Sequence, residues 1–369
     1  MPVYWGIFFL AAITGLFVTK NIDESWEQDK IAQVRKHNVR GVWLVWFAIV
    51  LFAGFRDRCV DTYMYISVYE RMPTGIAALK SALEGNMGNA TLWVASEIVI
   101  KSLISEHHYA FFMFVAIVTG WAISRAYKEH ATNLGLTVFL FVASCAFSWF
   151  FNGIRQFLAV AITFGFSHYL RDGKRIRYLI VIALVSLIHV SAWVLLPVCI
   201  FDVTKKAFDR KTILIAVAVL IMFGMSDTFL PIINRLLETD YDFEEAAGAG
   251  FIRTLVLAIP VILALINSDA VENASGTVKL AVNMSLIGCA LSLASTFTSG
   301  ILVGRLPMYF SLYNYYLIPW ELDHIFTKEN TRRDLKILCV VLYTLYFIYQ
   351  MHIAWGGLQY RSNFFGMDY

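Results

Sequence analysis

The chain has 369 residues, of which 59% are hydrophobic and 15% charged, with a net charge of +3 and a mean hydropathy of +0.63. This balance excludes an ordinary soluble domain and indicates an all-α, polytopic membrane protein. No stretch has the length and polarity of an independent soluble domain, so residues 1–369 are expected to form a single transmembrane domain. The five cysteines are scattered without disulfide or metal-ligand spacing, and no metal site or other cofactor is expected.

The apolar runs predict about 11 transmembrane segments, because each is long enough to be a span of the hydrocarbon core. In chain order they lie at 3–19, 41–55, 109–124, 134–151, 154–170, 178–201, 212–230, 251–267, 280–302, 309–325 and 337–353. The positive-inside rule places the loops that are rich in Lys and Arg in the cytoplasm. These loops lie at 20–40, 125–128, 171–177, 205–211 and 328–336.

Segment 178–201 conflicts with this pattern, because the loops before and after it are both basic although a single span would separate them. A re-entrant hairpin of two half-helices that enters from the cytoplasm, with His189 near its tip, would resolve the conflict. Backbone of this kind is tolerated only beside protein or a water-filled cavity. The alternative is an ordinary single span with one wrongly predicted loop.

With the hairpin accepted, two loops and the C-terminal tail fall on the outer side of the membrane. One is an external loop at 56–108, and the second external loop is at 231–250. Residues 92–106 of the first loop show helical apolar spacing with charges on one side, which is typical of a helix lying in the membrane interface.

One arginine interrupts the longest apolar stretch. Between Leu134 and Leu170 the only formally charged side chain is that of Arg155. At about 1.5 Å per residue a straight helix over this stretch would overshoot the membrane nearly twofold, so two spans joined at Asn152-Gly153 are expected. Because a charge that faces lipid costs on the order of 2.5 kcal/mol, Arg155 is expected to face a wet cavity or an anionic partner.

The basic residues left for the outer side are mostly arginines, whose planar guanidinium binds phosphate oxygens bidentately. Four of them, Arg56, Arg155, Arg253 and Arg305, lie at the outer ends of apolar runs. There they could converge on a phosphate at the membrane surface. The alternative for each one is snorkelling toward lipid headgroups.

The segment that follows residue 55 carries charged residues and tyrosines directly after a predicted span. Asp61 near an arginine would stay ionised and could act as a general base toward a sugar hydroxyl, while Tyr65 offers a face for stacking. The alternative is a solvated loop with local ion pairs. His189 is a second candidate proton acceptor, and its alternative role is a hydrogen-bonded packing group.

Four short motifs follow one another along the chain. They are Arg56 with Asp61-Thr62 and Tyr65, Asn152-Gly153-Ile154-Arg155-Gln156 with Ala159, His189-Val190-Ser191-Ala192 before Leu196-Pro197, and Gly304-Arg305-Leu306 with Tyr309-Phe310. Together they resemble the EpsG family of Wzy-type polysaccharide polymerases over nearly the whole chain. One departure is Cys59-Val60, where family members often carry a glycine before the Asp-Thr pair.

The resemblance implies a scaffold similar to class C glycosyltransferases and a role in capsule, exopolysaccharide or O-antigen assembly. The enzyme would act at the outer face of the bacterial inner membrane. It would transfer a growing glycan from undecaprenyl pyrophosphate to the non-reducing end of a lipid-linked repeat unit, independently of metal.

The same resemblance suggests roles for the candidate residues. Arg155 and Arg305 are expected to contact the pyrophosphate, and Arg56 to support a second lipid phosphate or Asp61. Asp61 or His189 would orient the attacking hydroxyl. The substrate-binding set also includes Arg253 and Tyr65.

The expected partners are the undecaprenyl pyrophosphate-linked oligosaccharide and membrane lipids. A chain-length regulator and a flippase are candidate partners, and no nucleic acid is expected. Two rival functions remain open. A flippase of lipid-linked oligosaccharide would be expected to carry cations along a central channel, and a membrane acyltransferase would need a polar partner for His189.

Overall fold

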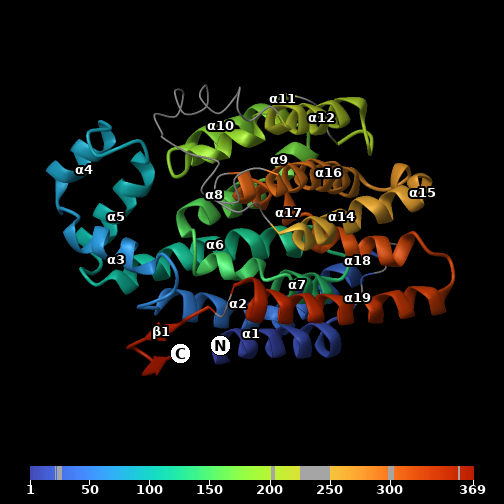
Figure 1. Ribbon diagram of the computed structural model, residues 1–369, viewed down its shortest axis with the longest axis horizontal. Coiled ribbons are helices and arrows are strands. Elements are labelled where there is room, and N and C mark those ends of the chain that lie inside the picture. The colour runs from blue at the N-terminus through green and yellow to red at the C-terminus, as the bar shows by residue number, and fades with distance from the viewer. Residues whose placement is uncertain (21, 23–26, 201–203, 225–249, 298–302, 356–357) are drawn as a thin grey trace. The chain divides into compact units, whose positions relative to one another are not determined.

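The computed structural model is almost entirely helical, which confirms the predicted all-α class (Figure 1). It describes residues 1–20, 22, 27–200, 204–224, 250–297, 303–355 and 358–369. The elements up to the predicted hairpin are α1 (Pro2–Ile13), η1 (Thr14–Val18), α2 (Gln28–Gly54), α3 (Thr62–Arg71), α4 (Ile76–Leu83), α5 (Thr91–Leu103), α6 (His108–His130), α7 (Leu134–Ala143), η2 (Ala146–Phe150), α8 (Ile154–Gly165) and α9 (His168–Arg171). The remaining elements are α10 (Arg175–Ser186), η3 (Val190–Leu195), α11 (Leu196–Ile200), α12 (Arg210–Gly224), α14 (Phe251–Ile266), α15 (Ser268–Glu272), α16 (Gly276–Thr296), η4 (Val303–Arg305), α17 (Met308–Ser311), α18 (Asn314–His324), α19 (Glu329–Tyr349), η5 (Gln350–Ala354), β1 (Arg361–Ser362) and β2 (Met367–Asp368).

Several of these helices are suited to a membrane. The four that are long and apolar enough to cross one, within the described part of the chain, are Lys30–Gly54, His108–His130, Gly276–Thr296 and Glu329–Ala354. Shorter apolar helices occupy Pro2–Val18, Leu134–Ala143, Val190–Ile200 and Phe251–Ile266. The chain is therefore a multi-pass α-helical membrane protein, while a total of 11 spans stays a prediction.

The predicted helix break at Asn152-Gly153 is confirmed. The 3-10 helix η2 ends at Phe150, and α8 begins directly after Gly153, whose φ is +61°. Only glycine adopts this left-handed conformation without a steric penalty, which explains why the break falls at this residue. A further break between α7 and η2 lies at Cys145, where φ is +63°.

Segment 178–201 is not a single helix. The helix α10 ends at Ser186, and η3 starts at Val190, so His189 lies in the break between them. The carbonyl of Leu187 accepts a hydrogen bond from the backbone N–H of Leu92 at 3.0 Å, which fixes the break against the start of α5. The helix is thus interrupted at His189, while the re-entrant hairpin and its entry from the cytoplasm stay predictions.

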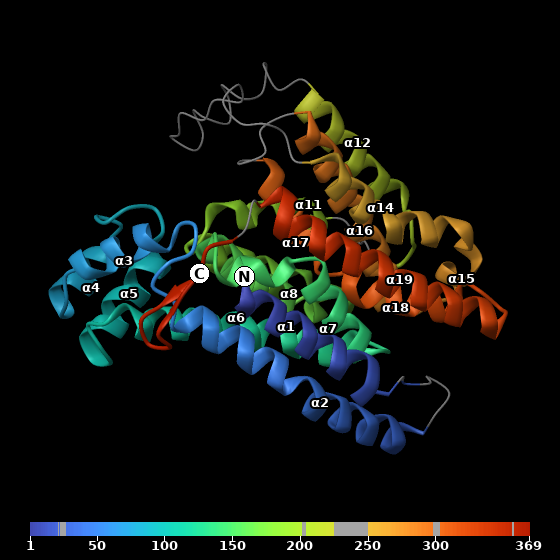
Figure 2. The ribbon, with the colours of Figure 1, turned by 60° about the horizontal axis from the view of Figure 1, so that its bottom comes forward.

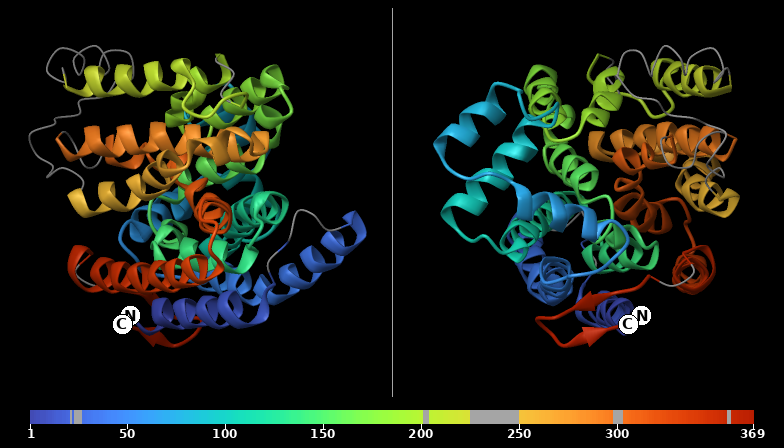
Figure 3. Two further views of the ribbon diagram at one scale, coloured as in Figure 1. Left: turned by 90° about the vertical axis from the view of Figure 1, so that its right-hand side faces the viewer. Right: turned by 60° about the vertical axis from the view of Figure 1, so that its left-hand side comes forward.

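The helices form two compact units. Unit 1 comprises residues 1–167, 180–193 and 333–369, and unit 2 comprises 168–179 and 194–332. In unit 2, the helices α12, α14 and α18 pack against the long helix α16 (Figure 3). The predicted second external loop at 231–250 falls almost entirely on residues 225–249, which lie outside the described residues.

Unit 1 contains the predicted external loop, which is largely helical. Helix α5 packs against α4 and against the N-terminal part of α6, and α3 also packs against α6 (Figure 1). The two-stranded hairpin β1–β2 near the C-terminus lies beside the chain that leaves α2 (Figure 2). There the carbonyl of Arg361 accepts hydrogen bonds from the backbone N–H groups of Asp57 and Arg58, at 2.8 and 3.2 Å.

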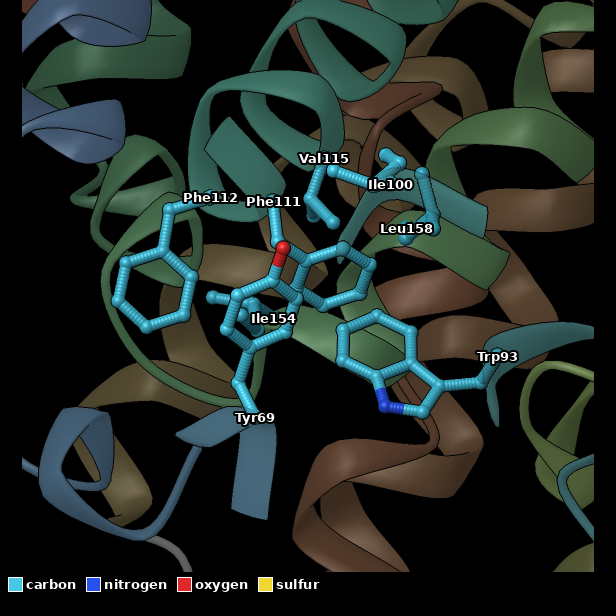
Figure 4. Packing of buried hydrophobic residues seen from close by; sticks show 8 residues of the cluster. All are labelled: Tyr69, Trp93, Ile100, Phe111, Phe112, Val115, Ile154 and Leu158. Atoms are coloured by element: carbon cyan, nitrogen blue, oxygen red, sulfur yellow. The ribbon is translucent and has the colours of Figure 1, made fainter. Parts of the chain in front are cut away.

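An aromatic cluster joins this external element to α6 and α8 (Figure 4). The ring of Tyr69 stacks on that of Phe111 at 5.5 Å, and Trp93 meets Phe111 edge-on at 4.9 Å. Ile154 and Leu158 of α8 pack against the same cluster. The start of α8 is therefore held next to α3 and α5.

Helix α5 confirms the helix predicted within 92–106, but of its charged residues Glu97 does not lie at the surface. That side chain is only 1% exposed, because α5 packs between its neighbours in the external element. Lys101 is also engaged: its Nζ donates to the carbonyls of Tyr69, Glu70 and Met72 at 3.0, 2.8 and 2.8 Å. These bonds satisfy carbonyls at the C-terminal end of α3, where a cation is favourable.

Candidate functional site

The N-terminal end of α8 brings together most of the predicted site residues in unit 1. The backbone N–H of Gly153, which precedes the helix, donates to Asp61 Oδ2 at 2.8 Å. The N-cap residue Gly153 has no side chain of its own that could cap α8. A helix N-terminus carries partial positive charge, so this end of α8 is favourable for an anion.

Arg155 is the second residue of α8 and is partly exposed. Its positive charge and a hydrogen bond from its backbone N–H both lower the pKa of the Tyr65 hydroxyl. Burial, followed by the charge of Asp61, raises the pKa of Tyr65 to about 12, so the phenol stays protonated at neutral pH. The structure thus places the predicted residues Arg155, Tyr65 and Asp61 around one helix end.

Arg56 is almost completely buried, with 1% of its surface exposed. Its Nε donates to the hydroxyl of Thr62 at 3.0 Å, and its Nη1 donates to the carbonyl of Ala53. The guanidinium lies over the ring of Phe112 at 4.2 Å. Burial lowers the pKa of Arg56 from its usual range and the nearby charge of Asp61 opposes this, so Arg56 is a fixed internal cation beside Asp61.

His189 is linked to α8 through two side chains. The amide Nε2 of Gln156 donates to Ser191 Oγ at 3.2 Å, and this hydroxyl lies 2.7 Å from His189 Nδ1. The backbone N–H of Ser191 also points to Nδ1, at 3.3 Å. Because Nδ1 accepts these bonds, the hydrogen-bond pattern assigns the proton of the neutral imidazole to Nε2.

Glu97 belongs to the same neighbourhood and was not among the predicted site residues. Burial raises the pKa of Glu97 to about 7, while the indole of Trp93 and the charge of Arg155 act in the opposite direction. The sequence did not indicate this, because the helical spacing of 92–106 groups Glu97 with the other charged residues on one side of the helix. Only the packing of α5 against α3 and α8 shows that it is internal.

Asp57 anchors the C-terminal hairpin rather than this site. Its Oδ2 accepts from the hydroxyl of Tyr109 and from the backbone N–H of Asn363, both at 2.6 Å, and its Oδ1 lies 3.3 Å from His108 Nε2. These contacts join the end of α2, the start of α6 and the C-terminus. The network is structural, and nothing in the sequence pattern indicated it.

Two predicted arginines lie in the other unit. Arg253 lies in the first turn of α14, and Arg305 is the last residue of η4. Because they belong to unit 2, their convergence with Arg155 on one phosphate stays a prediction.

Among the described residues, no group of three or more His, Cys, Asp or Glu side chains is arranged to hold a metal ion. The charged groups that the structure gathers at the start of α8 are instead the cation Arg155 and the acid Asp61. This arrangement can bind an anion, hold a hydroxyl group and exchange a proton.

Comparison with known proteins identifies a family. A model of the EpsG family matches residues 42–362, which include α8 and every predicted site residue. No curated protein and no solved structure matches the chain.

Proposed function

The chain belongs to the EpsG family, and from this premise and the site at the start of α8 we propose that it is a polysaccharide polymerase. Family membership indicates a polymerase-type role in polysaccharide biosynthesis. The proposed reaction transfers a growing glycan from undecaprenyl pyrophosphate to the non-reducing end of a lipid-linked repeat unit. It takes place at the outer face of the bacterial inner membrane.

The observation that carries this proposal is the position of Arg155 at the N-terminus of α8. The anomeric carbon of the donor sugar loses its bond to the pyrophosphate oxygen, and the electron pair leaves with the pyrophosphate. Negative charge therefore grows on the leaving group, and a partly exposed guanidinium at a positive helix end can stabilise it. Arg253 and Arg305 are proposed as further pyrophosphate contacts.

The acceptor hydroxyl must lose its proton as its oxygen bonds to the anomeric carbon. Asp61 and His189 are the two candidates, and the hydrogen bonds separate them. Nδ1 of His189 already accepts from the Ser191 backbone N–H, which makes this nitrogen the less suitable acceptor for a substrate proton. Asp61 is therefore the proposed proton acceptor, and His189 a proposed donor to a substrate oxygen.

Arg56 supports Asp61 in this scheme. The sequence left two roles for Arg56, which could support either a second lipid phosphate or the side chain of Asp61. Its burial, its contact with the ring of Phe112 and its bonds to the chain favour the second, because a buried guanidinium attracts the nearby Asp61 carboxylate.

The test uses purified protein in liposomes with a lipid-linked repeat unit from its own pathway, with and without a chelator. The wild-type protein is expected to make a ladder of longer lipid-linked glycans that survives chelation. The Arg155→Ala variant is expected to lose about 10²- to 10³-fold in rate, the range for removal of one group that stabilises a developing anion.

Arg71→Ala is the matched control, because Arg71 is an exposed arginine at the end of α3 in the same external element. It is expected to polymerise at the wild-type rate. An equal loss in both variants would show only a general need for surface charge. Movement of labelled lipid across the bilayer without any ladder would indicate a flippase instead.

A further inference from the structure

A cavity of about 360 Å³ lies within unit 1, away from the candidate site. It forms where the π-helical turn η1, the start of α7 and the first half of α19 meet. Most of its wall is apolar. The apolar side chains that line it are Leu16, Leu136, Ile337, Val340 and Val341.

The cavity arises because α19, which runs beside α1, is held to it by an aromatic contact at one end (Figure 1 and Figure 3). There the ring of Phe347 stacks on that of Phe8 at 4.4 Å, and Phe8 lies 5.7 Å from the ring of Phe139 on α7. About two helical turns further along, η1 packs directly on the backbone of α7. A Cβ atom added to Gly15 would meet the carbonyl oxygen of Gly135 at 2.6 Å. The turn η1 and α7 are thus in close contact, and the cavity is the wedge between them and α19.

The cavity lies at the opposite end of α1 from the candidate site. The hydroxyl of Tyr4, near the start of α1, is 3.5 Å from Sγ of Cys59, which follows α2. Gly15 at the cavity lies about 16 Å further along the helix. The basic segments that adjoin this end of the helices are the ones predicted to be cytoplasmic, 20–40, 125–128 and 328–336. The cavity therefore belongs to the membrane face opposite to the proposed reaction.

The polar side chains of the cavity are suited to an anion. Lys336 is half-buried and is the only charged residue among the described residues that line it. Asn133 uses its Oδ1 to accept from the backbone N–H of Leu136 at 2.9 Å, which leaves its amide NH2 group to donate to a ligand. The hydroxyl of Thr19 donates to the carbonyl of Gly15 at 3.1 Å.

The rim of the cavity is apolar and exposed. Ile337, Val341 and Leu16 are 57%, 47% and 41% exposed, and they belong to helices that are suited to a membrane. In a bilayer such a rim faces the hydrocarbon core. Because apolar walls offer water few hydrogen-bond partners, an acyl chain is the occupant that fits them.

We propose that this cavity binds one anionic phospholipid, with an acyl chain in the wedge and the phosphate at Lys336 and Asn133. Basic pockets between membrane helices on the cytoplasmic side favour anionic head groups. Lys336 lies about 10 Å along α19 from its start at Glu329, and from this depth a lysine reaches the interface by extending its stem. A bilayer phospholipid is favoured over the polyprenyl carrier because the cavity lies on the face opposite to the proposed reaction. The bound lipid joins α19 to η1 and α7.

The test uses the purified full-length protein in non-ionic detergent that contains phosphatidylglycerol with a photoreactive diazirine in its acyl chain. After irradiation, peptide mapping is expected to place the label on η1 and on α19 around Val340. Unlabelled phosphatidylglycerol should prevent labelling at a concentration about fivefold lower than phosphatidylcholine, whose head group has no net charge. Fivefold is the contribution of one lysine near an anionic lipid surface.

Two sets of variants test the head group and the acyl chain separately. Lys336→Met is expected to abolish the preference for phosphatidylglycerol, and Lys336→Arg to keep it. Lys328→Met removes an exposed lysine of the same basic segment and should match the wild type. Val340→Trp places an indole in the cavity and should block labelling, whereas Leu338→Trp, at a position that is 49% exposed, should not.

Equal displacement by the two phospholipids, or an unchanged preference in Lys336→Met, would overturn the proposal, because the cavity would then hold any bilayer lipid. Equal labelling of Val340→Trp and wild type would show that the lipid binds elsewhere and would also overturn it. Stronger displacement by undecaprenyl phosphate than by phosphatidylglycerol would assign the cavity to the polyprenyl carrier, against the proposal. The polymerase reaction is measured separately by the glycan ladder, so each of these results leaves it untouched.

Discussion

Replacing Glu97 by glutamine is expected to stabilise the protein above neutral pH. Burial raises the pKa of Glu97 from 4.5 to about 7 in the folded protein. Between these two values the folded state binds a proton that the unfolded state has lost. The associated stability is therefore fully present below pH 4.5 and is lost as the pH rises through 7.

The size of the effect follows from the two pKa values. Each pH unit between them is worth about 1.4 kcal/mol, so a wild-type protein loses on the order of 3 kcal/mol between pH 4.5 and pH 8. Glutamine keeps the shape of the protonated carboxyl and does not ionise. The variant should therefore escape this loss, and its unfolding temperature should exceed that of wild type by several degrees at pH 8.

Thermal unfolding in detergent at pH 4.5, 6 and 8 measures the difference, and Glu106→Gln provides an exposed acid as the control. The gap between wild type and Glu97→Gln should open as the pH rises, while Glu106→Gln follows the wild type. Parallel curves for wild type and Glu97→Gln over the whole range would refute the reasoning, because Glu97 would then titrate as it does in the unfolded chain.

Three other substitutions test separate parts of the structure. Lys101→Met removes three hydrogen bonds to the end of α3 and should destabilise this element by about 1–3 kcal/mol, seen as faster amide exchange in α3. Gly153→Ala places a side chain at a φ of +61° and should cost about 1–2 kcal/mol in unfolding free energy, with a weaker bond to Asp61 and a slower polymerisation. Ser191→Ala breaks the link from α8 to His189 and should slow polymerisation roughly five- to tenfold, the change in rate that corresponds to about one lost hydrogen bond. If any one of these variants behaves like the wild type in its assay, the role assigned to that contact is refuted.

The helices were predictable because membrane spans are long apolar runs whose ends are marked by charges. The break at Gly153 and the interruption at His189 could also be predicted, one from the length of the run and the other from the basic loops on both sides. The left-handed Cys145 could not, because nothing in a continuous apolar run indicates a change of backbone conformation at a cysteine.

The structure brings some of the residues singled out in the sequence to one place. Arg155, Asp61 and Tyr65 lie at the start of α8, and His189 is linked to α8 through Ser191, while their roles stay predictions. The burial of Arg56 and Glu97 was not predictable, because helical periodicity reports which residues share a face of one helix. It does not report which neighbouring helix will cover that face.

The most direct test of the account is the stoichiometry of the reaction. It uses purified protein in liposomes, supplied with a lipid-linked repeat unit that is labelled in both its glycan and its lipid. The account predicts that one undecaprenyl pyrophosphate is released for each new glycosidic bond, and that both products disappear together in Arg155→Ala. Transfer of the labelled lipid across the bilayer with neither a new bond nor a released pyrophosphate would contradict it.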